Sequence, residues 1–357
     1  MRAVTVADAA LTAAEHGDLR ELVADTLVTK GTALAYLGRT IEGLGAIAAA
    51  KALAEAADLD TVAMRAAVNA SSITPIDSPA LGLTLAREGL AIARRLGSRP
   101  YATILIGNAG EAALRTGEWT WGLTAVEGAL DDDIDPVDRV GMLETLVQYR
   151  ALQGGPAGAL HEEATRLAGG DPEPQVRANL HIGSAFVALV AGELRQARDE
   201  FRAAGRLSAP TVGVASPMAA RLSLWLGDAE GCRADLEALA ASGFHGRAIE
   251  ASVRTSEAGL AALGGRPDDA RARYREAMQA WRDLGSLWDL ALAGIDMATL
   301  MDPSDPDVRA EAERSREILV DLGAAPFVER LDAALARGAV HPAPPLVGAE
   351  AHDRTPA

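Results

Sequence analysis

The stretch Gly265-Arg266-Pro267-Asp268-Asp269-Ala270-Arg271-Ala272-Arg273-Tyr274-Arg275-Glu276-Ala277 contains the pattern that decides the fold. Small residues stand five and twelve positions after the first glycine, a large residue stands nine positions after it, and another small residue, Ala258, precedes it by seven. Weaker copies centre near Asp77 and Gly155, and neighbouring copies lie 35–40 residues apart. The same offsets recur from four further glycines, which together with Gly265 we term the anchor glycines: Gly38, Gly117, Gly192 and Gly227.

This pattern predicts a repeat of two antiparallel helices. The anchor glycine ends the first helix, because glycine adopts the left-handed conformation of a helix C-terminus without strain. The small residues, among them Gly110, Ala185 and Ala258, are expected where the paired helices approach most closely. One such hairpin cannot bury its apolar face alone, so the copies must stack. We therefore expect an all-α, right-handed α-solenoid of about eight to nine hairpins over residues 1–338.

The composition and the two ends of the chain fit this expectation. Alanine, leucine, arginine and glutamate dominate, and these residues favour helices over strands. Residues 2–15 match the second helix of a pair, so the chain is expected to start mid-repeat. Residues 305–322 and 325–337 are expected to form the last pair. The Pro/Ala-rich tail, residues 339–357, is predicted to be disordered.

Three stretches carry a more specific resemblance. The repeat as a whole resembles the tetratricopeptide family. Residues 29–35, 107–119 and 322–331 look like the C-terminal helical-repeat region of large actinobacterial signalling proteins. Those proteins join a class III adenylate/guanylate cyclase domain or a LuxR-type DNA-binding domain to a STAND-type ATPase. The resemblance implies a regulatory arm that senses a partner or ligand, with no catalytic residue in this chain and no cofactor.

The charge and cysteine content exclude several classes of function. A net charge of −16 argues against partners that are themselves anionic, whether nucleic acid or an acidic membrane surface. The sequence has no Gly-x-x-x-x-Gly-Lys-Ser/Thr phosphate-binding loop, and neither of its two lysines lies in one. Its single cysteine, Cys232, is expected to be a buried small hydrophobe. No apolar run reaches membrane-spanning length, so we expect a cytoplasmic protein.

One string suggests enzymatic chemistry. Residues 131–135, Asp-Asp-Asp-Ile-Asp, fit the DDxxD motif with which terpenoid synthases bind Mg²⁺ and diphosphate. Pro136 follows at once, which favours a loop in which Asp135 caps the next helix. Only 4% of the residues are aromatic, too few to shelter a carbocation. The capping interpretation is therefore preferred, and the terpenoid-synthase function is a remote alternative.

The expected binding surface is the concave wall, which the first helices of the hairpins line. The preferred function is an interaction module, acting in cis or in trans on a cyclase/ATPase protein; the alternative is a sensor that binds a small-molecule effector. An extended polar groove would favour the former, and a pocket lined by tryptophan and polar groups the latter. The N-terminal helix, with few charges, is expected to dock a partner or a second copy. The candidate residues of the wall are Asp25, Thr29, Thr32, Asn108, Glu111, Arg115, Asn179 and Arg221.

Overall fold

The computed structural model describes residues 2–337, and the tail predicted at 339–357 lies outside this range. Within it the chain forms α-helices and two short 3₁₀ helices, with no strand. The all-α prediction is confirmed. The elements are α1 (Arg2–His16), α2 (Arg20–Ala35), α3 (Thr40–Ala56), α4 (Asp60–Ile73), η1 (Thr74–Ile76), α5 (Pro79–Arg95), α6 (Arg99–Thr116), α7 (Trp119–Asp131), α8 (Pro136–Gln153), α9 (Ala157–Ala168), α10 (Pro174–Val190), α11 (Leu194–Leu207), η2 (Ala209–Thr211), α12 (Val212–Trp225), α13 (Ala229–Ala241), α14 (Arg247–Leu263), α15 (Pro267–Asp283), α16 (Leu287–Leu300), α17 (Pro306–Asp321) and α18 (Ala325–Arg337).

The anchor glycines end helices as the repeat predicts. All five have positive φ, between 70° and 88°, and each stands between two consecutive helices. The weaker copies differ. Gly154, and not Gly155, has the left-handed conformation after α8, and Asp77 follows η1 with a φ of −100°. The fourth residue of a 3₁₀ turn needs no positive φ, so no glycine is required at that position.

Small residues allow paired helices to approach closely. A Cβ atom added to Gly31 of α2 would lie 2.5 Å from the carbonyl oxygen of Gly43 and 2.7 Å from Ile47, both on α3. Gly110 of α6 is likewise buried, and a Cβ there would lie 3.2 Å from Val126 of α7. Side chains larger than hydrogen would therefore force these pairs apart. The other two small residues predicted at such contacts are fully buried, namely Ala185 and Ala258.

Both ends of the described range, residues 2–337, are helical as expected, but the last helices pair differently. We expected α17 to form a hairpin with α18. Instead α17 packs mainly on α16, and α18 packs on both of them and on α8. Phe327 of α18 explains this position, because its ring packs edge-on against Trp288 of α16 with centroids 4.8 Å apart. Helix α18 thus takes the place of a further first helix of the series.

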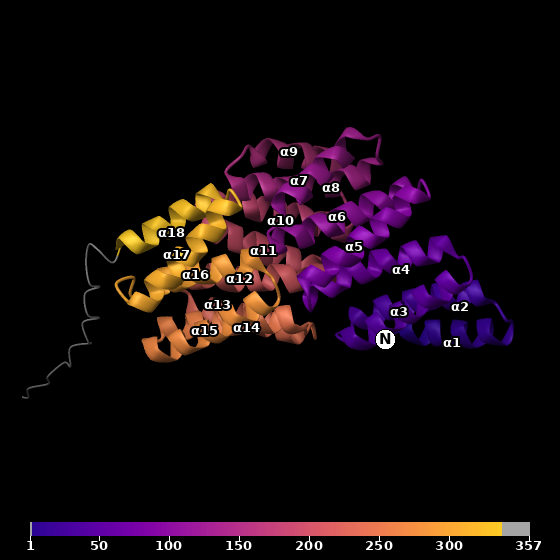
Figure 1. The fold of residues 1–357 in the computed structure, drawn as a ribbon, viewed down its shortest axis with the longest axis horizontal. Coiled ribbons are helices and arrows are strands. Elements are labelled where there is room, and N and C mark those ends of the chain that lie inside the picture. Colours follow the sequence, from indigo (N-terminus) through magenta and orange to yellow (C-terminus); the bar gives the residue numbers. More distant parts are fainter. Residues whose placement is uncertain (1, 338–357) are drawn as a thin grey trace, which may run out of the picture.

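The even-numbered helices line the inside of the stack. Contacts join α2 to α4, α4 to α6, α6 to α8, and α8 to α10, and further contacts join α12 to α14, α14 to α16 and α16 to α18. In Figure 1 the stack rises from α1 at the lower right to α9 at the top and descends to α15. The odd-numbered helices lie outside this wall, so the chain has the layered arrangement of an α-solenoid.

The stack curls until its C-terminal helices contact its middle. Helix α14 packs on η1, which follows α4, α16 packs on α6, and α18 packs on α8. Each of these three C-terminal helices thus contacts the region of the helix that precedes it by ten in the chain. The loop before α14 closes a further contact, because a Cβ at Gly38 would lie 2.5 Å from the carbonyl oxygen of Gly243. We call these contacts between the C-terminal helices and the earlier part of the stack the closure. They depend on the curvature of the whole stack, and no single repeat contains them.

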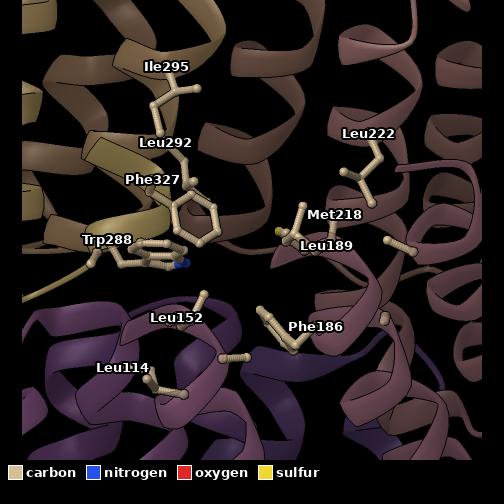
Figure 2. Close-up of a cluster of buried hydrophobic side chains, with 14 of the residues drawn as sticks. Leu114, Leu152, Phe186, Leu189, Met218, Leu222, Trp288, Leu292, Ile295 and Phe327 are labelled. Carbon is tan, nitrogen blue, oxygen red and sulfur yellow. The ribbon is translucent and has the colours of Figure 1, made fainter. Parts of the chain in front are cut away.

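A hydrophobic cluster fills the closure. It gathers buried side chains from α6, α8, α10, α12, α16 and α18. Figure 2 shows Trp288 and Phe327 facing Leu114 and Leu152 of α6 and α8. The C-terminal helices are therefore held by apolar burial as well as by polar contacts.

Candidate binding cavity

A cavity of about 560 Å³ lies on the inner wall, where the curled stack faces itself. It is lined by the first helices α4, α6, α8, α10, α12, α14 and α16, with residues from η1, η2, the turn after α2 and the loop before α14. Such a volume is in the range of pockets that hold small organic molecules. On the concave side, where the repeat predicts a groove, the first helices thus line a cavity.

Five of the eight predicted binding residues line this cavity: Asn108, Glu111, Arg115, Asn179 and Arg221. The other three lie elsewhere, on α2, where they bind side chains of α4. Arg65 donates to Asp25 (Nη1–Oδ1, 2.6 Å) and to Thr29 (2.9 Å), and Thr32 donates to Oδ1 of Asn69 (3.0 Å). These three residues do not line the cavity, and their role in binding stays a prediction.

Arg115 is fixed at the point of closure. Its Nε donates to Oδ2 of Asp289 on α16 at 3.0 Å, and its Nη1 donates to the carbonyl oxygen of Pro75 at 3.2 Å. The hydroxyl of Ser286 donates to the same Asp289 oxygen at 2.7 Å. The guanidinium group also lies 5.8 Å from the ring of Trp281. Arg115 therefore has a bound counter-ion before any ligand arrives.

Arg221 is likewise paired, but deep in the protein. Its Nε donates to both carboxylate oxygens of Asp296, at 3.2 and 2.9 Å, and the indole of Trp225 donates to Oδ1 at 2.7 Å. Burial acts to lower the pKa of Arg221, but the carboxylates of Asp296 and Asp289 outweigh it and raise this pKa. The arginine is therefore held as a cation at one end of the cavity wall.

Within residues 2–337, Asn108 and Asn179 each use one of the two polar atoms of the side-chain amide in a hydrogen bond and leave the other free for a ligand. Nδ2 of Asn108 donates to the Val68 carbonyl at 3.0 Å and to Ser71 Oγ at 2.9 Å, while its Oδ1 has no hydrogen bond within the described part of the chain. Asn179 has the opposite arrangement, since its Oδ1 accepts from Gln175 at 3.1 Å. A free acceptor and a free donor thus remain on the wall.

Glu111 differs from all the other candidates. Its side chain is exposed at the cavity, of which it forms part of the lining. No hydrogen bond or ion pair holds its carboxylate within residues 2–337. Burial raises the pKa of Glu111 to about 7. A carboxylate in this state is open to a ligand.

Apolar side chains cover much of the remaining wall. Three of them are exposed at the cavity although they are large: Ile104, Val137 and Val214. Trp288 is almost completely buried, but it contributes to the lining. The cavity therefore combines apolar area with a few polar groups, which is the usual composition of a small-molecule site.

Sequence reasoning missed the part of the site that α14 and α16 supply. Asp289 and Trp288 come from a helix about 180 residues after Asn108, and their repeat position alone carries no signal for contact with α6. Gln148 was also missed, although it lies on the first helix α8. A count of polar residues on every first helix would have found Gln148, but not the two residues that depend on closure.

The Asp131–Asp135 string lies outside this cavity. Asp131 ends α7, and Asp135 precedes α8, where its Oδ1 accepts the backbone N–H of Val137 at 2.9 Å. The expected cap is confirmed. Asp132 contributes to a second, outer pocket of about 580 Å³ between α5, α6 and α7. Across the described residues, no three His, Cys, Asp or Glu side chains are grouped so that they could share a metal ion.

Cys232 lies at a packing position, as predicted. It is fully buried against Ala220 and Leu224, and burial raises the pKa of its thiol to about 12. The thiol is therefore not nucleophilic near neutral pH. Among the helices of residues 2–337, none is both long and apolar enough to cross a bilayer.

The chain matches no protein-family model, and a comparison with curated proteins finds no similar sequence. The geometry of the cavity therefore carries the interpretation of the site.

Proposed function

We propose that this chain is a non-enzymatic sensing module that binds a small-molecule effector in the central cavity. The observation that carries the proposal is the closure of the inner wall into a cavity of about 560 Å³, lined by Trp288, by polar side chains and by exposed apolar ones. An extended protein partner would need an open groove along the whole wall. A compact cavity instead suits a ligand that can be surrounded.

The closure also suggests how binding acts on the rest of the molecule. A ligand in the cavity would touch α6 and α16, which meet only because the stack curls. It would thus stabilise the curled form over more open ones, in proportion to its difference in affinity for the two. Surfaces that move with α16 would report occupancy to a partner.

The finer architecture and the biological setting belong to the same proposal. We propose a right-handed solenoid of eight hairpins, from α2–α3 to α16–α17, with α1 and α18 at its ends. The partner is a cyclase/ATPase signalling protein, in cis or in trans, or a second copy of the chain, and the location is cytoplasmic. The resemblance of residues 29–35, 107–119 and 322–331 supports this setting. Neither ATP hydrolysis nor cyclic-nucleotide synthesis is expected from the purified chain.

Filling the cavity tests the proposal. Gly141 of α8 lines the cavity, and a Cβ there would meet no atom within 4 Å, so Gly141→Leu places a side chain in the cavity without a clash. Gly158 of α9 has the same open surroundings and lines neither pocket, which makes Gly158→Leu the matched control. A metabolite library is screened by thermal shift against all three proteins.

Compounds that bind in the cavity should raise the melting temperature of the wild type and of Gly158→Leu, and lose this effect with Gly141→Leu. The proposal fails if no compound stabilises the wild type. It also fails if the compounds found stabilise Gly141→Leu equally well.

A further inference from the structure

The charges that line the cavity do not balance. Five charged residues line it: Glu111, Arg115, Asp138, Arg221 and Asp289. Both arginines are already paired with carboxylates, Arg115 with Asp289 and Arg221 with Asp296. Glu111 and Asp138 have no cationic partner in the described part of the chain. The cavity therefore holds an excess of negative charge that the protein itself does not neutralise.

The free state of Glu111 results from the fold. Arg115 follows Glu111 by four residues on α6, the spacing at which glutamate and arginine pair along a helix. Closure prevents this, because the guanidinium group of Arg115 reaches across to Asp289 and to the carbonyl oxygen of Pro75. Two acceptors from other elements thus hold the cation that could have neutralised Glu111.

An unpaired carboxylate on the wall of a cavity can gain from a cationic partner, and the residues beside Glu111 show what such a partner would contact. Asn108 lies one turn earlier on the same face of α6, and its Oδ1 accepts no hydrogen bond from any residue that the structure describes. Ile104 lies one turn before that, with an exposed apolar side chain. One face of α6 thus presents a negative charge, a hydrogen-bond acceptor and an apolar surface in sequence.

We propose that the effector is a small organic cation, an amine or guanidine with an apolar body, whose charged group pairs with Glu111. Its N–H groups donate to the Glu111 carboxylate and to Oδ1 of Asn108, and its apolar part lies against Ile104. This inference rests on the proposed function, since it names the chemistry of the ligand for the same cavity. A charge-assisted hydrogen bond away from bulk water is among the stronger polar contacts.

The test compares ligands that differ only in their charged group. Phenethylamine, phenethyl alcohol and 3-phenylpropanoate form one series, and tryptamine, tryptophol and indole-3-propionate form another. Binding to the wild type, Glu111→Gln, Glu88→Gln and Gly141→Leu is measured by calorimetry and ligand-observed NMR at pH 8, at which Glu111 is ionised. Glu88 is exposed on α5 and forms no ion pair with any residue of the range 2–337, so Glu88→Gln removes the same charge outside the cavity.

The amines should bind the wild type and Glu88→Gln about tenfold or more tightly than the alcohols, which corresponds to one ion pair of about 1.4 kcal/mol. Glu111→Gln should remove this preference, and Gly141→Leu should remove binding. If the alcohols bind as tightly as the amines, or the carboxylates bind more tightly, and Gly141→Leu abolishes this binding, then the proposal of a cationic ligand is wrong. The proposed sensing function would still stand. Absence of binding in all series overturns the cationic ligand, and a metabolite screen that also finds no compound overturns the function itself.

Discussion

Arg115 on α6 and Asp289 on α16 form an ion pair with an Nε–Oδ2 distance of 3.0 Å, although 174 residues separate them in the sequence. A second pair spans 170 residues, since Arg247 at the start of α14 binds both carboxylate oxygens of Asp77. Both join the early part of the stack to the helices ten positions later. Polar contacts of this kind fix how tightly the solenoid curls, and hence the shape of the cavity.

Loss of the Arg115 charge should loosen the closure. Arg115→Met keeps most of the volume but leaves Asp289 half-buried without its cation, so the free energy of unfolding should fall by about 1.5–3 kcal/mol. Chemical denaturation measures this change, and hydrogen exchange should increase at the start of α16. The control is Arg266→Met, which breaks the exposed pair with Asp269 and should cost below about 1 kcal/mol. Equal effects of the two variants would contradict this account of the closure.

The buried pair of Arg221 and Asp296 should be more sensitive. Asp296→Asn keeps an acceptor for the indole of Trp225 but leaves Arg221 as a buried cation without a counter-ion, at a cost of about 3–5 kcal/mol. Replacing both residues, as Arg221→Met with Asp296→Leu, should cost far less than the single change. Urea denaturation of the wild type and of these two variants measures the difference. A double variant that is as unstable as Asp296→Asn would show that the charge is not the cause.

Two glycines on neighbouring helices should respond to alanine with opposite signs. Gly31→Ala puts a methyl group 2.5 Å from the Gly43 carbonyl oxygen, so α2 and α3 must move apart, at a cost of about 1–3 kcal/mol. Gly45→Ala on α3 meets no atom within 4 Å and should stabilise by about 0.5–1 kcal/mol, because alanine favours the helix. Denaturation midpoints test both. A stabilising Gly31→Ala would refute the close contact of the hairpin.

The repeat was predictable because every hairpin needs the same residue types at the same positions: a glycine to end the first helix and small residues where the two helices touch. Gly117, Gly192 and the other anchor glycines carry their signal within about twenty residues, and burial of Ala185 or Ala258 follows from contact with the next helix. The part of the candidate site on α6 was predictable in the same way, from positions within one repeat. Asn108, Glu111 and Arg115 face the inner wall because they lie on one face of a first helix.

The closure was not predictable from the repeat. The pairing of Arg115 with Asp289 depends on the summed curvature of ten helices, which no single repeat position encodes. The same holds for Gly38, whose left-handed turn was predicted but whose contact with Gly243 was not. The cavity follows from this curvature. Asp25, on α2, contributes no atom to its lining, a fact that the repeat position of Asp25 does not encode.

The Asp131–Asp135 string should contribute through its last member. Asp135→Ala removes the acceptor for the Val137 N–H at the start of α8 and should cost about 0.5–2 kcal/mol. The double variant Asp131→Ala/Asp132→Ala removes two exposed carboxylates that form no hydrogen bond in the described chain and should change stability little. Thermal denaturation compares them. If Mg²⁺ stabilised the wild type and not the double variant, the capping interpretation would be insufficient.

The pH dependence of stability should show that the fold raises the pKa of the Glu111 carboxyl group. The pKa of Glu111 is about 7 in the folded protein and 4.5 in the unfolded chain, because burial disfavours the charged form. Between these values the folded protein keeps a proton that the unfolded chain releases. The contribution of Glu111 is thus most favourable below pH 4.5 and is lost as the pH rises through about 7.

Glu111→Gln cannot ionise and should escape this loss. Relative to the wild type, it should be more stable at pH 8 than at pH 4.5, with most of the change between these values; water in the cavity screens the charge and keeps the difference below that of a dry site. Urea midpoints at several pH values give the curve. Glu88→Gln, which removes an exposed charge, should parallel the wild type throughout. If Glu111→Gln also runs parallel, the carboxylate is solvated like any surface glutamate, and the cavity has no unrelieved charge for a ligand to neutralise.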